Sequence, residues 1–153
     1  MTALPDDLTS IGRAIIDANL YMVLGTADED GRPWASPVYY APVAYREFFW
    51  VSRPEARHSR NLVLRPQLGI VIFDSSVEIG TGRGVYMSAV AEQLAGTEAE
   101  ESSEIFSHRS LGHGGYAWTP GDVEPPAQFR LFRAIAEKIY VLDENDRRVT
   151  VTL

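Results

Sequence analysis

The sequence predicts a single domain that is mainly β, with an antiparallel sheet and a few helices (an α+β arrangement). Segments rich in Val, Ile, Phe, Trp and Tyr recur along the chain between turn residues, as in strands joined by hairpins. The length of 153 residues fits one domain, covering residues 1–153. Hydrophobic residues make up 45% and charged residues 23% of the chain, which is enough apolar material for a folded core.

The charge balance and the absence of cysteine exclude several classes of protein. Fourteen Lys and Arg residues oppose 21 Asp and Glu residues, which argues against general nucleic-acid binding. Disulfides, zinc ribbons and thiol catalysis all require cysteine, and the chain has none. Residues 1–7 show no secretory signal, and no apolar run approaches the roughly 18 residues of a membrane span. We therefore expect a cytoplasmic protein with no membrane partner.

The first elements are a helix and a hairpin. An amphipathic helix is expected over residues 5–19, with Pro5 in its first turn and apolar residues at helical spacing: Leu4, Leu8, Ile11 and Ile15. Residues 20–26 are apolar on both faces, and residues 34–42 are extended and aromatic. The acidic segment 28–31 supplies turn chemistry between them. These residues predict a β-hairpin.

The middle of the chain alternates strands with a short helix. Aromatic and β-branched residues predict a strand over 48–51 and a second over 68–73. Between them, a helix is expected over 53–64, because Pro54 suits the first helical position. A further strand is expected over 85–94, where apolar side chains alternate to one side.

The last third combines a helix, a loop and two strands. Thr97 and Glu100 have the spacing of a capping box, so a helix is expected from Thr97 to about Arg109. Glycines and prolines over 110–127 predict a loop or lid. The final strands are expected over 129–142 and 147–152.

Strands that are apolar on both faces cannot leave one side of a sheet in water. In a domain of this size, the sheet is expected to close as a barrel and to bury outer surface against helices or another subunit. The sequence therefore predicts a homodimer.

The segment 53–65 carries the strongest chemical signal. It holds four arginines and one glutamate, a local excess of positive charge in a chain of net charge −7. On one continuous helix, Arg53, Arg57 and either Arg60 or Asn61 would project on one side, where guanidinium groups bind phosphate in pairs of hydrogen bonds. His58 and Ser59 would add donors. The alternative is an exposed helix face whose arginines pair with acidic residues.

Other segments give weaker or negative signals. The glycine run 80–84 lacks the Rossmann spacing and leads into a strand, so a flexible turn is expected. His108 and His113 belong to no metal-ligand pattern, and no serine lies in a hydrolase elbow. We expect no metal site. Trp118 lies in the Gly/Pro-rich loop and is predicted to cover a partner subunit's pocket. The other aromatic residues are expected in the core or in an interface: Trp34, Tyr39, Tyr40 and Trp50.

The order and spacing of these segments resemble the pyridoxamine 5′-phosphate oxidase-like, FMN-binding split-barrel family and its flavin- and deazaflavin (F420)-dependent relatives. The resemblance covers nearly the whole chain. Besides the opening helix, it rests on the hairpin motif Leu24-Gly25-Thr26, Asp30-Gly31-Arg32-Pro33 and Ser36-Pro37-Val38, the strand Phe49-Trp50-Val51-Ser52, the helix Ala56-Arg57-His58-Ser59-Arg60-Asn61-Leu62 followed by Arg65-Pro66, and the strand Gly84-Val85-Tyr86.

The resemblance implies a six-stranded antiparallel split β-barrel, an obligate homodimer and two cofactors in grooves between the subunits. Ser36, Pro37 and Val38 resemble residues that flank the isoalloxazine ring, and Val51 and Ser52 resemble residues near the ribityl chain and phosphate. Arg57 and His58 stand at the implied phosphate clamp, and Asn61 follows one helical turn later. Trp118, with Arg130 or Arg133, is implied on the far side of the groove.

The chain also departs from the family pattern at three places. His58 stands where relatives often carry lysine. Arg83 and Gly84 lie where the oxidase proper has a glutamine at the flavin. The chain ends in Val149-Thr150-Val151-Thr152-Leu153, where the oxidase proper has an Arg-Leu-x-Pro signature. Oxidation of pyridoxamine phosphate itself is therefore not expected.

The expected function is an FMN- or F420-dependent oxidoreductase that transfers a hydride between the cofactor and a small organic substrate. The cofactor supplies this chemistry, so no catalytic side chain is assigned. One alternative is a flavin or haem carrier or sensor without turnover, for which an axial ligand would come from His58, His108 or His113. Another is a dimeric scaffold whose groove is degenerate.

Overall fold

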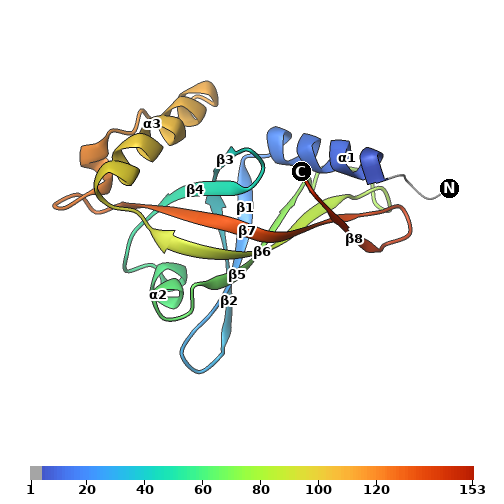
Figure 1. Ribbon diagram of the computed structural model, residues 1–153, viewed down its shortest axis with the longest axis horizontal. Helices are drawn as coiled ribbons and strands as arrows, with labels where there is room; N and C mark the ends of the chain where they lie inside the picture. The colour runs from blue at the N-terminus through green and yellow to red at the C-terminus, as the bar shows by residue number, and fades with distance from the viewer. Residues whose placement is uncertain (1–4) are drawn as a thin grey trace.

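The computed structural model describes residues 5–153 (Figure 1). Within these residues, eight strands form one antiparallel sheet in the order β2-β1-β5-β6-β7-β4-β3, with β8 paired to β7. The helices are α1 (Pro5–Ala18), α2 (Arg57–Leu64), α3 (Gly96–Gly112) and the 3-10 helix η1 (Pro120–Val123). The strands are β1 (Tyr21–Ala27), β2 (Pro33–Tyr39), β3 (Ala41–Val43), β4 (Glu47–Ser52), β5 (Gln67–Phe73), β6 (Gly84–Gln93), β7 (Arg130–Leu142) and β8 (Arg148–Val151).

The predicted fold class is confirmed: a curled, mainly β antiparallel sheet with peripheral helices, consistent with a split barrel. The strand count is eight in the described residues, where the resemblance implies six. The difference arises because the segment 34–42 is divided at Tyr40 into β2 and β3, and because the short β8 adds a strand. Tyr40 is fully buried, and its hydroxyl donates to the carbonyl oxygen of Ile16 at 2.6 Å. Leu4 lies outside the described residues.

The main core fills the inside of the curled sheet. In β1 and β4, alternate side chains point inward, as strand geometry requires, and these include Leu24 and Trp50. Leu8 and Ile16 of α1 cover one part of this core and Leu62 of α2 joins it at another. In Figure 1, α1 and α3 lie above the sheet toward opposite ends of β7, and α2 lies below it.

Helix α3 packs on the outer face of the sheet. A second apolar cluster joins it to β3, β4 and β7, and its buried members are Ala41, Phe49, Leu94, Ala99, Phe106, Val123 and Leu131. Strand β4 therefore serves two layers, since its alternate residues point into the barrel and toward α3. This arrangement places Val51 on the α3 side and Ser52 on the barrel side.

Two helix starts differ from their predictions. Helix α2 begins at Arg57, because the chain first makes a turn in which the Ala56 N–H donates to the Arg53 carbonyl oxygen at 3.1 Å. Pro54 is therefore not in the first helical turn, and Arg53 is not on the helix. Helix α3 begins at Gly96 after Ala95, with no side-chain cap, so the capping box predicted for Thr97 and Glu100 is wrong. The box occurs instead in η1, between Thr119 and Asp122.

Candidate functional site

Helix α2 is fastened to the end of the barrel by two buried polar pairs. His58 Nε2 lies 2.8 Å from the Ser52 hydroxyl on β4. One turn later, the Asn61 side-chain amide donates to the Thr26 hydroxyl on β1 at 3.0 Å. All four residues are buried. Three of the residues predicted to bind a cofactor, Ser52, His58 and Asn61, are thus brought together, and their contacts fix α2 on the barrel.

Burial also determines the charge of His58. Desolvation lowers the pKa of its imidazole, because an apolar environment disfavours the charged form. His58 is therefore neutral at neutral pH, and one of its nitrogens is already bonded to Ser52. It does not provide the second positive charge that a phosphate clamp requires.

Of the four arginines of the segment 53–65, Arg53 and Arg57 lie over aromatic rings. The Arg57 guanidinium lies over the Trp34 ring, 4.4 Å from its centroid, and the Arg53 guanidinium lies 5.6 Å from the centroid of Phe129. Arg65 donates to a backbone carbonyl, that of Glu29. In the described part of the chain, no carboxylate forms an ion pair with these arginines. The pKa of Asp28 is lowered mainly by the Arg32 N–H that it accepts and in smaller part by the Arg57 guanidinium, so Arg57 is partly balanced by this carboxylate. The remaining positive charge of the segment is available to an anion.

A cavity of about 590 Å³ opens between the sheet edge and α3, and we call it the aromatic cavity. It lies within the size range of pockets that bind small molecules and cofactors. Val51 and Trp118, which the resemblance placed at the cofactor, both line it. The complete lining is Leu20, Tyr21, Tyr39, Val51, Phe106, Ser110, His113, Gly114, Gly115, Tyr116, Trp118 and Phe129.

The Trp118 loop is held against α3 by specific contacts. The Trp118 backbone N–H donates to the Ser107 hydroxyl at 2.8 Å. Its indole ring makes edge contacts with Phe106 and Phe129, with ring centroids 6.0 and 5.7 Å apart. Such edge-to-face pairs are favourable arrangements of aromatic rings. The segment predicted as a loop over 110–127 is only partly irregular, because α3 extends to Gly112 and Pro120–Val123 form η1. Residues between 110 and 118 form one wall of the cavity.

Tyr39 and His113 form a hydrogen-bonded pair in the cavity wall. The Tyr39 hydroxyl lies 2.7 Å from His113 Nδ1. His113 caps the C-terminal end of α3, since its N–H bonds to the carbonyl oxygens of Arg109 and Ser110. Burial raises the pKa of Tyr39, and the nearby Arg109 guanidinium opposes this shift without reversing it. Tyr39 therefore carries its proton at neutral pH.

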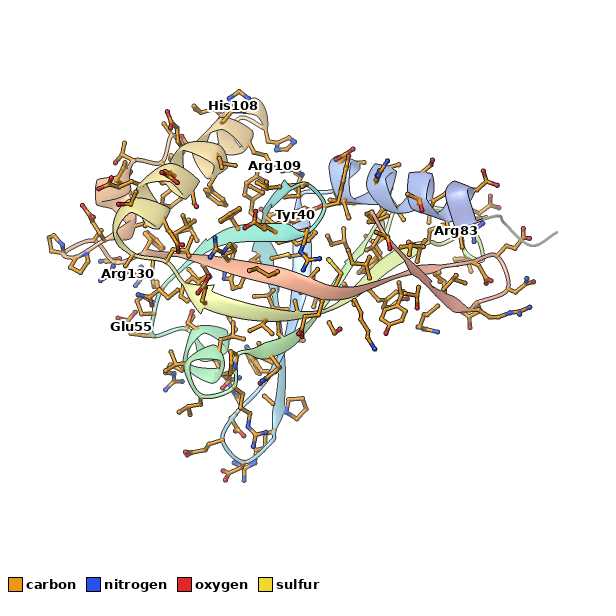
Figure 2. All side chains as sticks on the ribbon, in the orientation of Figure 1. Tyr40, Glu55, Arg83, His108, Arg109 and Arg130 are labelled. Carbon is orange, nitrogen blue, oxygen red and sulfur yellow. The ribbon has the colours of Figure 1, made fainter. Side chains whose placement is uncertain are left out.

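Arg109 and His108 take opposite directions from α3. The Arg109 guanidinium lies over the Tyr40 ring at 5.1 Å and donates to the Asn19 carbonyl oxygen at 2.9 Å. Figure 2 shows Arg109 directed toward Tyr40 and His108 on the opposite side of the helix. His108 is exposed and does not line the aromatic cavity.

The remaining predicted residues lie apart from the cavity. Ser36, Pro37 and Val38 lie on β2 opposite Leu24, Val23 and Met22 of β1, and Val38 is buried in the main core. Arg130 donates to the carbonyl oxygens of Ala127 and Phe129. Arg133 forms ion pairs with three carboxylates, those of Glu47, Glu92 and Glu98, which occupy its charge.

A second hollow lies on the outer face of the sheet, and we call it the sheet groove. Its volume is about 890 Å³. Small residues leave the backbone accessible along a row that crosses four neighbouring strands, β2, β1, β5 and β6. In this order they are Ala35, Gly25, Gly69 and Ser88. Trp34, which also lines the groove, is exposed.

The described residues contain no group of three or more His, Asp or Glu side chains arranged to hold a metal ion. Among residues 5–153, no helix is both long and apolar enough to cross a membrane.

Sequence reasoning missed the pairing of Tyr39 with His113. Tyr39 was expected in the core or an interface, and His113 was considered only as a metal or haem ligand. The two residues are 74 positions apart, so their contact depends on how α3 folds back over β2. The glycines that follow His113 were the available local signal, because they end α3 at this point.

The curled antiparallel sheet with a helix on its outer face defines the chain as a split-barrel protein. A model of the family described as pyridoxamine 5′-phosphate oxidase matches residues 11–143, and the chain belongs to this family. A pyridoxine/pyridoxamine 5′-phosphate oxidase from Rubrobacter xylanophilus is 30% identical over 141 residues, which cover 87% of this chain and 62% of that protein. The chain spans less than two thirds of the length of the curated relatives it matches.

Solved structures with the same fold include haem proteins. A haem-binding protein from Mycobacterium smegmatis has a TM-score of 0.73 and 20% identity, over 92% of this chain and 55% of that one. HutZ, the haem storage protein from Vibrio cholerae, has a TM-score of 0.69 and 21% identity, over 87% and 92%. At this level of identity, the likeness concerns the fold.

Proposed function

We propose that the chain binds a flavin nucleotide, FMN or its deazaflavin analogue F420, and transfers a hydride between this cofactor and a small organic substrate. One observation carries the proposal: the aromatic cavity, of suitable size for a flat ring, lies beside Arg53, which forms no ion pair in the described residues. Arg53 stacks on Phe129, which lines the cavity, and Arg57 follows at the start of α2. Membership of the pyridoxamine 5′-phosphate oxidase family supports the same proposal.

The residues present fit such a cofactor in two parts. Val51 and Trp118 would contact the ring, and Arg57 with Arg53 would hold the phosphate through charge-assisted hydrogen bonds. His58, Ser52 and Asn61 would act by holding α2, and with it Arg57, in position. We assign Ser36, Pro37 and Val38 a backbone role beside the ring. The bound cofactor would supply the hydride chemistry, and the chain would orient it and exclude water.

We also propose that the protein acts as a homodimer. The sheet groove is lined by strand residues alone, and apolar surface is open to solvent there, including Trp34, which is 42% exposed. Burying this face against a second copy would remove apolar area from water. The measurement is the solution mass by light scattering. Twice the chain mass of 17.0 kDa is expected, and a 17 kDa species at micromolar concentration would exclude the dimer.

A haem carrier or sensor is the second candidate, and one observation favours it. His113 lines the aromatic cavity with Nδ1 held by Tyr39, which leaves Nε2 for a ligand, as in histidines that bind metals. His58 is buried with Nε2 bonded to Ser52, and His108 does not line the cavity. Of the three histidines, His113 is therefore our proposed axial ligand. The haem-binding proteins among the solved structures support this candidate.

Titrations with FMN, F420 and haemin distinguish the candidates. We expect saturable flavin or F420 binding that Arg57→Ala weakens by about tenfold or more, since a hydrogen bond to a charged group contributes about 1.5–3 kcal/mol. Arg147→Ala, an exposed arginine in the β7–β8 turn, is the matched control and should leave affinity unchanged. A Soret band lost in His113→Ala but retained in His108→Ala would favour the haem carrier. Binding of none of the three would reject both candidates.

A further inference from the structure

The Tyr39–His113 pair presents a proton donor to the aromatic cavity. Both side chains line it, with 2.7 Å between the Tyr39 hydroxyl and His113 Nδ1. We propose that Tyr39, supported by His113, is the proton donor of this site and that its substrates are planar, conjugated carbonyl compounds. The inference rests on the proposed hydride transfer and adds a catalytic side chain, which the sequence analysis did not assign.

The Tyr39 ring is held in place by its neighbours. Its centroid lies 5.6 Å from that of Phe106 and 6.2 Å from that of Tyr21, and both pairs meet edge to face. The next residue, Tyr40, is fully buried and bonded to the Ile16 carbonyl oxygen, which anchors the end of β2. A donor held on a packed element keeps its orientation when a ligand enters, which is a requirement for efficient proton transfer.

Three titratable or charged groups face Tyr39: Tyr21 from β1, Arg109 from α3 and His113 from the end of α3. Because burial raises the pKa of Tyr39, the hydroxyl keeps its proton until a substrate accepts it. The Arg109 guanidinium favours the phenolate that remains after transfer. When His113 carries its proton on Nδ1, it donates to the Tyr39 oxygen and leaves the phenol proton free to face the cavity.

The proton and the hydride together balance the reduction. A bound reduced flavin or deazaflavin would supply a hydride, that is two electrons and one hydrogen, to the β-carbon of the substrate, whose C=C π electrons would shift toward the carbonyl. Tyr39 gives its proton to the carbonyl oxygen, so an enol forms and then isomerises to the saturated ketone or aldehyde. His113 returns its Nδ1 proton to Tyr39 and takes another from water. The substrate gains two electrons and two hydrogens, and the cofactor is oxidised by the same two electrons.

The cavity lining favours this substrate class. Trp118 and Phe129 lie in edge contact with one another and present aromatic surface to the cavity, which suits a flat conjugated molecule. A carbonyl oxygen is an acceptor that matches the Tyr39 donor, and conjugation makes the β-carbon a hydride acceptor. An anionic substrate would instead require a cation in the lining, and the lining contains neither lysine nor arginine.

The first test uses two probes of nearly the same shape on the cofactor-free protein. 4-Methoxybenzaldehyde carries a carbonyl acceptor, and 4-methylanisole lacks it. By calorimetry we expect Tyr39→Phe to weaken aldehyde binding about three- to tenfold and to leave 4-methylanisole binding unchanged. Tyr116→Phe removes another hydroxyl from the same lining and is the matched control, with no change expected. An equal effect on both probes, or an equal effect of both variants, would overturn the proposal.

The second test measures proton transfer with the cofactor bound. Reduced, FMN- or F420-loaded protein is mixed anaerobically with 4-phenylbut-3-en-2-one, and cofactor oxidation is followed. We expect Tyr39→Phe to slow it about 100-fold or more with cofactor affinity unchanged. His113→Gln should slow it less and change its pH profile, whereas His108→Gln should do neither. Unchanged rates in Tyr39→Phe and His113→Gln would overturn the proposal.

The two tests separate failure of this inference from failure of the proposed function. If the wild-type protein binds neither FMN nor F420, the hydride-transfer function fails, and the calorimetric test still decides whether Tyr39 donates to a carbonyl. If Tyr39→Phe does not fold, His113→Gln provides the second variant, judged against His108→Gln. A Tyr39→Phe protein that folds, binds the cofactor and reduces the enone at the wild-type rate would leave only a structural role for the pair.

Discussion

The contribution of the Ser52–His58 hydrogen bond to the free energy of unfolding measures how strongly α2 is held on the barrel. His58→Leu removes the imidazole that lies 2.8 Å from the Ser52 hydroxyl, and Ser52, only 8% exposed, is left without that partner. An unsatisfied buried polar group costs about 1–3 kcal/mol, and we expect a loss of unfolding free energy in this range. In Ser52→Ala/His58→Leu, both polar groups are gone, so most of the loss should be recovered.

Urea unfolding of the wild type, the two single variants and the double variant completes this thermodynamic cycle. We expect a coupling energy of about 1–2 kcal/mol between the two positions. Because α2 carries Arg57, His58→Leu should also weaken cofactor binding, and the double variant should restore part of it. Additive single-variant effects, with no coupling, would refute the idea that this hydrogen bond holds α2 on the barrel.

Three further predictions follow from burial and packing. Burial lowers the pKa of His58 in the folded state, so the unfolded chain binds this proton more readily, and the free energy of unfolding should fall as pH drops below about 6.5. In urea titrations, His58→Gln should reduce this pH dependence, and His108→Gln should not. Phe106→Ala should lower the unfolding free energy by about 3–5 kcal/mol in the same assay, since this ring is 3% exposed and packs between Tyr39 and Trp118. Gly69 lines the sheet groove, and a Cβ there would meet nothing closer than 4.0 Å. Gly69→Arg should therefore leave the circular dichroism spectrum unchanged but halve the solution mass, whereas Gly112→Arg at the end of α3 should not change the mass.

Much of the fold could be predicted from the sequence because its signals are local. Alternating and continuous apolar segments gave the strands, and turn residues separated them. The helix starts were less predictable, because Pro54 is as compatible with a turn as with a first helical residue, and the structure places it in the turn before Arg57. The capping pattern at Thr97 likewise predicted the wrong first residue, because α3 begins at Gly96.

The candidate site was predictable only in part. The charge excess over 53–65 is a local property, and its arginines form no ion pair in the described residues. The division of its residues between buried pairs and exposed cations depends on which side of α2 meets the barrel. The aromatic cavity depends on contacts between segments far apart in sequence: Val51 and Trp118 line it together, and Tyr39 is hydrogen-bonded to His113. No periodicity or spacing in the sequence specifies these contacts.

A fluorescence titration with FMN and F420 on wild-type protein and Val51→Trp tests the central claim most directly. Val51 lines the aromatic cavity, so the larger ring should fill the space we assign to the flavin. Val63→Trp is the matched control, because Val63 on α2 is 76% exposed and does not line the cavity. The account predicts saturable binding to the wild type and to Val63→Trp, and at least a tenfold loss in Val51→Trp. Equal affinity in all three proteins would contradict it.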